Sequence, residues 1–165
     1  MFILLFVKVT SSIFETPSNK FVVYRHLWHT VADQKFVIFK VRACSDAHIL
    51  LARYFGVTDY DVYEIWLGKS SNSLSTITVG ISGTILAQQA TNQILHCTHS
   101  RWFWIDWSRG ITVGNGPLVG DLTFLNISAA TLPRVFDIST VAVDTGPNES
   151  GDWEFSSVPG MYVIR

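Results

Sequence analysis

Hydrophobic and polar side chains alternate along most of this chain. Residues 36–43 show the pattern most clearly, because Val37, Phe39 and Val41 occupy every second position. A period of two places these side chains on one face of a β-strand. The alternation recurs in further runs rich in Val, Ile, Thr, Phe and Trp, at residues 63–67, 76–81, 102–107, 111–113, 123–127 and 135–143. Each run is predicted to be a strand, since these residue types suit a pleated sheet.

Turn-forming residues separate the predicted strands, and no repeat or linker divides the chain. Gly, Asn, Ser and Pro gather at residues 68–72, 82–83, 114–117 and 146–148. Many short strands at regular spacing predict an all-β fold, an antiparallel two-sheet β-sandwich of jelly-roll type with little helix. Residues 46–55 also fit a helix capped by Asp46, but their neighbours are predicted strands, so a strand is the preferred interpretation.

The composition limits the classes of protein to which the chain can belong. It has 165 residues, of which 48% are hydrophobic and 15% charged, and a formal net charge of -1. Lys and Arg (12) do not exceed Asp and Glu (13), so the basic excess of an electrostatic nucleic-acid binder is missing. We expect one domain over residues 21–165. The low charge has three explanations: strands that are apolar on both faces, packing against a partner, or an aromatic binding surface.

Tryptophan placement is compatible with an aromatic binding surface. Trp102 and Trp104 share one face of their predicted strand, whereas Trp107 lies on the other face with Phe103, in a core position. Trp66 likewise lies opposite the apolar face of its strand. Exposed rings would stack on sugars or hold an apolar chain. The alternatives are a covered second layer or a subunit interface.

The first 20 residues form a separate segment. Their apolar run, residues 1–7, is shorter than the roughly 20 residues of a membrane-spanning helix. The segment is either a short or truncated signal peptide, although it lacks a basic start, or an extra strand. Secreted and cytoplasmic locations both remain open, and secretion is slightly favoured.

Two further features bear on the compartment. Glycosylation sequons begin at Asn126 and Asn148, and Asn148 is the better acceptor because it lies in a Gly- and Pro-rich loop. Cys44 and Cys97 would form one disulfide in an oxidising compartment or remain as buried thiols otherwise.

Three segments in order resemble the farnesoic acid O-methyltransferase domain family of invertebrates. They are residues 46–49 (DAHI), residues 63–68 (YEIWLG) followed by Asn72 and Ser75, and residues 102–116 (WFWIDWSRGITVGNG). The resemblance spans about residues 36–155 and implies an antiparallel β-sandwich, which also occurs as a module in secreted proteins. The family name implies methyl transfer from S-adenosylmethionine to farnesoic acid. The resemblance assigns no catalytic residue.

The residues themselves support this chemistry poorly. Residues 114–116 follow a predicted strand, as the Gly-rich turn of a nucleotide-binding site does, and Asp137 lies downstream, where such a site has an acidic residue for the ribose. Such a site also needs a helix after the glycines, but residues 123–128 favour a strand. By residue type, His48 and Arg109 are candidates for a base or for a group that binds the substrate carboxylate. His48 is nevertheless more typical of a histidine that is hydrogen-bonded on a sheet face. Two clusters contain residue types that bind zinc, His26 with His29, and His96 with Cys97 and His99. Their spacings do not match those of known zinc sites, so no metal is expected.

The sequence therefore predicts a ligand-recognition module for a carbohydrate or a small apolar ligand, without a cofactor. Its candidate binding residues are Trp66, Trp102, Trp104, His48 and Arg109. The alternative is an S-adenosylmethionine-dependent O-methyltransferase acting on farnesoic acid. A third interpretation is a structural or self-associating domain that forms homo-oligomers. The expected partner is a small molecule or glycan rather than a nucleic acid.

Overall fold

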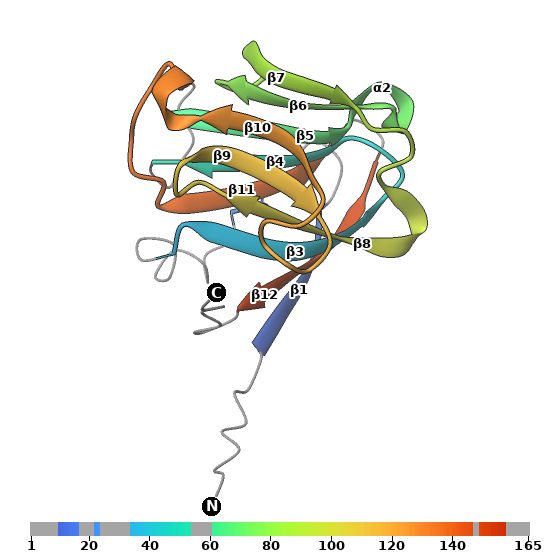
Figure 1. The fold of residues 1–165 in the computed structure, drawn as a ribbon. Helices are drawn as coiled ribbons and strands as arrows, with labels where there is room; N and C mark the ends of the chain where they lie inside the picture. The colour runs from blue at the N-terminus through green and yellow to red at the C-terminus, as the bar shows by residue number, and fades with distance from the viewer. Residues whose placement is uncertain (1–9, 17–21, 24–33, 54–60, 147–148, 158–165) are drawn as a thin grey trace, which may run out of the picture.

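Two antiparallel sheets, each of six strands, lie one over the other in the computed structural model (Figure 1). The structure describes residues 10–16, 22–23, 34–53, 61–146 and 149–157. Sheet A contains, in spatial order, β1 (Thr10–Thr16), β12 (Gly151–Ser157), β3 (Phe36–Ala43), β8 (His96–Asp106), β9 (Gly110–Asn115) and β10 (Thr123–Ser128). Sheet B contains β2 (Val22–Val23), β11 (Thr140–Thr145), β4 (Ala47–Ala52), β5 (Val62–Gly68), β6 (Leu74–Val79) and β7 (Thr84–Ala90).

Helical turns are confined to two short pieces of the described chain. They are α2 (Lys69–Asn72), in which residues 70–72 have left-handed φ, and the 3-10 turn η2 (Ala129–Thr131). The all-β, two-sheet prediction is thus confirmed, and residues 47–52 form a strand rather than a helix. No helix in the described ranges has the length and apolar character needed to cross a membrane.

The core lies between the sheets, where the alternating residues of facing strands meet. Phe39 packs against three other aromatic rings in this core. Its ring centroid lies 5.8 Å from that of Phe103, 5.7 Å from that of Trp153 and 5.4 Å from that of Phe155. Trp107 also belongs to this cluster, as predicted from its strand face. Fully buried aromatic pairs of this kind combine large buried area with specific ring geometry.

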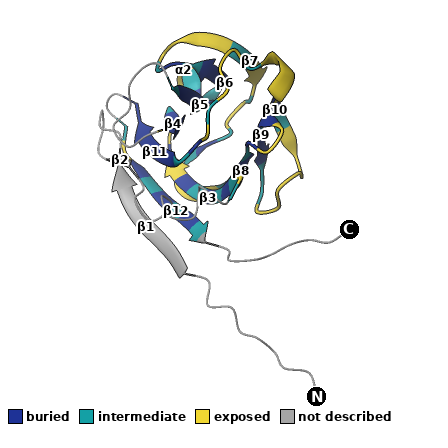
Figure 2. Ribbon diagram, turned by 90° about the vertical axis from the view of Figure 1, so that its left-hand side faces the viewer, coloured by how far each residue is buried: buried dark blue, intermediate teal, exposed yellow. Residues whose placement is uncertain are grey.

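The central strands of sheet B are buried on both faces, which Figure 2 shows as dark blue along β4, β5 and β11. Every residue of β4 and β11 is buried. Leu50, Val62 and Ala142 form a second apolar cluster on the face that does not meet sheet A, with Ile81 packed against it. This finding supports the first explanation of the low charge, because strands buried on both faces carry few charged residues.

One predicted strand has the wrong bounds. The run 135–143 becomes a strand only from Thr140, and Val135 is 89% exposed. Its apolar residues before that point connect η2 to β11 without pairing. The strands β7 and β12 were not predicted; β7 is an edge strand that is largely exposed and polar and shows no clean alternation.

A disulfide joins Cys44 at the end of β3 to Cys97 near the start of β8, across 53 positions of sequence. The pairing decides between the two alternatives left open for these cysteines. It ties together β3 and β8, which are paired neighbours in sheet A.

Candidate functional site

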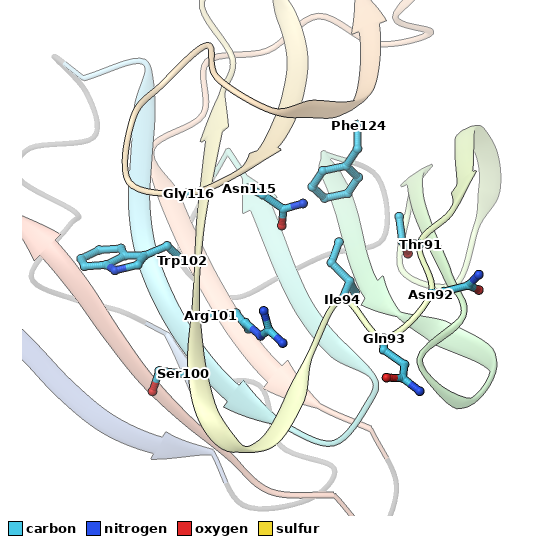
Figure 3. Close-up of a pocket in the computed structure, with 10 residues that line it drawn as sticks. All are labelled: Thr91, Asn92, Gln93, Ile94, Ser100, Arg101, Trp102, Asn115, Gly116 and Phe124. Atoms are coloured by element: carbon cyan, nitrogen blue, oxygen red, sulfur yellow. The ribbon is translucent and has the colours of Figure 1, made fainter.

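A groove of about 570 Å³ opens at the end of the sandwich near α2 (Figure 3). We call it the Arg101 groove. It is lined by Thr91, Asn92, Gln93, Ile94, Ser100, Arg101, Trp102, Asn115, Gly116 and Phe124. These residues come from the β7–β8 connection, the first half of β8, the end of β9 and the start of β10. Its volume lies within the range of roughly 300–1,000 Å³ that is usual for small-molecule sites.

The side chains of the groove do not all face its interior. Figure 3 shows Arg101, Asn115, Ile94 and Phe124 directed to the same side of β8. Trp102 projects from the opposite side, as strand alternation requires. The interior therefore combines one guanidinium, a carboxamide and an apolar patch, while the indole of Trp102 borders it from outside.

One wall of the groove is held rigidly by Asn72. Its Nδ2 donates to the carbonyl of Leu95 at 2.9 Å, and its Oδ1 accepts from the Leu95 N–H at 3.0 Å. The Gln93 N–H donates to the Asn72 carbonyl at 2.7 Å, and the Thr91 N–H to the Ser73 carbonyl at 2.9 Å. Leu95 itself is buried in the core. These bonds fix the backbone that presents residues 91–94 to the groove, which lowers the ordering cost of binding.

The opposite wall is also held by backbone bonds. The Gly116 N–H donates to the Trp102 carbonyl at 2.9 Å, and the Asn115 N–H donates to the Leu122 carbonyl at 3.1 Å. Phe124 packs edge-on against the core ring of Phe103. Both walls are thus continuous with the sandwich.

A second hollow of about 450 Å³ adjoins the groove and shares Asn92 and Gln93 with it. Its remaining lining residues are Ser71, Asn72 and Ser73. All five side chains are polar and uncharged. Together the two hollows form an extended surface rather than a single enclosed pocket.

The predicted exposed aromatic face is wrong for Trp104. This residue is only 1% exposed, and its Nε1–H donates to the Asp121 carbonyl at 2.9 Å. The loop between β9 and β10 therefore covers the ring, and the covered second layer is the correct alternative there. Trp102 remains half-buried, with the Lys40 ammonium 4.4 Å from its ring centroid.

Trp66 and His48 lie together on the far face of sheet B, away from the Arg101 groove. Their ring centroids are 4.1 Å apart, and His48 Nδ1 lies 2.7 Å from the Glu64 carboxylate. The interpretation of His48 as a hydrogen-bonded strand histidine is confirmed. Burial alone would raise the pKa of Glu64, but hydrogen bonds from His48, the Ser82 N–H and Thr78 outweigh it and hold the pKa below 4.5.

The other predicted site residues lie apart from the groove. Arg109 is exposed in the turn between β8 and β9, at the opposite end of that hairpin from Asn115. Asn126 is exposed on β10 and accepts a hydrogen bond from Thr112. Asn148 lies outside the described residues. The role of each as a glycosylation or ligand-binding residue stays a prediction.

The histidine clusters also fall in different places. His26 and His29 lie outside the described residues. His96 and His99 are close, with their Nδ1 atoms 3.2 Å apart, but Cys97 is engaged in the disulfide. The described ranges contain no group of three or more His, Cys, Asp or Glu side chains that could hold a metal ion.

Sequence comparison decides the family. A family model described as farnesoic acid O-methyltransferase matches residues 18–158, well over half of the chain. The chain belongs to the farnesoic acid O-methyltransferase family. A curated relative, "Uncharacterized protein 5" of Haliotis asinina, is 34% identical over 87 residues. The match covers 52% of this chain and 50% of that protein, so the chain spans about half the length of this relative.

Solved structures with a similar arrangement of strands are distant in sequence. The exoplasmic domain of VIP36 in its Ca²⁺/Man3GlcNAc-bound form has a TM-score of 0.48 and 12% identity, over 79% of this chain and 74% of that one. The binding domain of botulinum neurotoxin DC in complex with SialylT has a TM-score of 0.49 and 9% identity, over 90% of this chain and 42% of that one.

The residues that carry the family resemblance support one another structurally. Asp46 accepts a hydrogen bond from the Trp66 indole at 3.0 Å, which joins the first motif to the second. Gly68 has a φ of +68°, and a Cβ there would lie 2.7 Å from Asn72 Oδ1. Gly114 has Trp104 directly above it, where a Cβ would collide with the indole. In this farnesoic acid O-methyltransferase family chain, these motif residues therefore shape the sandwich and the groove wall.

The described residues do not fit S-adenosylmethionine, the cofactor that the family name implies. Residues 114–116 end β9 and lead through a loop into β10, so no helix follows the glycines. The Arg101 groove also offers no carboxylate to bind ribose hydroxyls. We derive no methyl-transfer step for this site.

Proposed function

We propose that this chain is a recognition module that binds carbohydrate in the Arg101 groove. The observation that carries the proposal is the Asn115 carboxamide inside the groove, with the exposed carboxamides of Asn92 and Gln93 along its edge (Figure 3). Each carboxamide offers both donors and an acceptor, which matches the paired donor and acceptor character of sugar hydroxyls. A wholly apolar ligand would leave these groups unpaired on burial, at a cost in affinity.

The apolar part of the groove complements the amides. Ile94 and Phe124 are half-buried and face the same space as Asn115 (Figure 3). A sugar ring has C–H faces as well as hydroxyls, and its C–H faces pack on such side chains. The adjoining hollow, polar throughout, gives a longer saccharide room for a second ring. The Cys44–Cys97 disulfide further supports a secreted location, where glycans are abundant and disulfides persist.

A glycan array probed with the full chain tests the proposal, followed by titration calorimetry on the best glycan. Asn115→Ala should weaken binding about tenfold, the worth of one or two lost hydrogen bonds. Gln88→Ala is the matched control, because Gln88 is an exposed amide on β7 outside the groove. An array without hits, or an Asn115→Ala variant that binds as wild type, would contradict the proposal.

S-adenosylmethionine and farnesoic acid belong in the same calorimetry series. Saturable heat with S-adenosylmethionine would favour the methyltransferase alternative over the recognition module. Sedimentation velocity on the free chain addresses self-association, since a dimer that dissociates on Asn115→Ala would indicate that the groove is a subunit contact.

A further inference from the structure

The Arg101 groove carries a positive charge that its own lining does not balance. Among its lining residues Arg101 is a cation and no side chain is a carboxylate. The ion pairs of the described residues use Lys40, Arg42, His48 and Arg53, but not Arg101. Arg101 is exposed, so its guanidinium is available to a ligand. A groove with one cation and no anion is electrostatically complementary to an anionic group.

The position of Arg101 in β8 is also unusual for a charged side chain. It continues the row of Phe103, Ile105 and Trp107, all of which point into the core. Its neighbour across the sheet is Val41, which is fully buried. Arg101 thus lies where the core-facing side chains of β8 reach the open end of the sandwich, and Figure 3 shows it directed into the groove.

We propose that the Arg101 groove binds an acidic saccharide, with the carboxylate or sulfate of one sugar residue paired to the Arg101 guanidinium. The planar guanidinium donates two parallel hydrogen bonds to such an anion, which a lysine cannot reproduce. Asn115 then binds ring hydroxyls, and Phe124 supports the ring from its C–H face. This inference rests on the proposed carbohydrate function and names the class of sugar.

Calorimetry with matched saccharides tests the acid preference. The probes are sialyllactose as the carboxylate, a sulfated lactose as the sulfate, and lactose as the neutral control. Wild type should bind at least one acidic probe about tenfold more tightly than lactose. Arg101→Gln should abolish that preference while binding of lactose is kept, and Arg101→Lys should retain only part of it. Whichever acidic probe binds tighter identifies the anion.

Lys35→Gln is the matched control, because it removes one positive charge from an exposed residue outside the groove, beside the end of β3 that pairs with Asp106. It should leave the acid preference unchanged, and thermal melting should show all three variants folded. Equal binding of acidic and neutral probes by wild type overturns the acid preference but leaves the carbohydrate function standing. An equal loss in Lys35→Gln also overturns it, since the attraction is then non-specific.

Failure of the underlying function has a different signature. If no saccharide binds wild type, the carbohydrate function itself is overturned, and this inference with it. Saturable, Arg101-dependent binding of farnesoic acid without binding of any saccharide would likewise overturn the sugar class, because the anion would then belong to an apolar acid.

Discussion

Replacing Asn72 with alanine should loosen the wall of the Arg101 groove and destabilise the whole domain. The Asn72 side chain bonds both the N–H and the carbonyl of Leu95, and Leu95 is buried at 1% exposure. Asn72 also has a φ of +61°, in the left-handed region that asparagine tolerates better than alanine. The substitution therefore removes two hydrogen bonds and adds backbone strain.

The expected loss follows from these contacts. Two hydrogen bonds contribute about 1 kcal/mol each, and an unpaired buried group costs about 1–3 kcal/mol when water cannot reach it. Left-handed backbone adds about 1 kcal/mol for a residue with a Cβ. Asn72→Ala should thus lower the free energy of unfolding by about 3 kcal/mol. Asn72→Gly, which loses the bonds but relieves the backbone, should lower it by about 2 kcal/mol.

Urea denaturation followed by tryptophan fluorescence measures both variants against wild type. In thermal melting of a domain of this size, the loss of about 2 kcal/mol expected for Asn72→Gly corresponds to a fall in Tm of about 4–8 °C. Asn126→Ala, which changes an exposed asparagine on β10, is the control and should shift the midpoint far less. If Asn72→Gly unfolds within about 0.5 kcal/mol of wild type, the Asn72–Leu95 bonds do not hold this wall, and the reasoning is refuted.

Three further outcomes are expected. Replacing Cys44 and Cys97 with serine removes a cross-link over 53 positions and should cost about 4 kcal/mol in urea denaturation; an unchanged midpoint would contradict the stabilising role. The stability that ionised Glu64 contributes is fully present above about pH 4.5 and is lost as the pH falls through its lowered folded pKa. Glu64→Gln should therefore make the free energy of unfolding fall less steeply as the pH is lowered. An unchanged pH dependence in the variant would contradict this role of Glu64. Gly114→Ala should force the Trp104 indole aside and cost about 2–4 kcal/mol, visible as a lower Tm and altered near-ultraviolet circular dichroism.

The sequence predicted the strands whose two faces differ in polarity. In β3, buried and less buried residues alternate without a break, and the same holds for the outer half of β10. The β12 strand also carries this signal, because Trp153 and Phe155 are buried at alternate positions. By contrast, β7 could not be found in this way, because it lies at an edge and most of its residues face solvent.

The candidate site was predicted less well than the fold. The tryptophan pattern predicted Trp102, which borders the groove, but also Trp66 and Trp104, which lie elsewhere. Arg101 and Asn115 were not singled out, because an isolated arginine and asparagine carry no spacing signal. The sequence does show that the alternate apolar residues Phe103, Ile105 and Trp107 are preceded by the charged Arg101. This change could have indicated that Arg101 lies at the open end of the sandwich and not in the core.

Local alternation by itself determined the fold class, since a period of two is a property of neighbouring residues and holds whatever the strand packs against. It also determined that Trp102 and Trp104 share a face. Only the tertiary structure decided which face is covered, because the loop carrying Asp121 shields Trp104 through contacts between residues 17 positions apart. The groove is likewise a product of long-range contacts: residues 91–94, Arg101, Asn115 and Phe124 meet only after the two sheets have packed together.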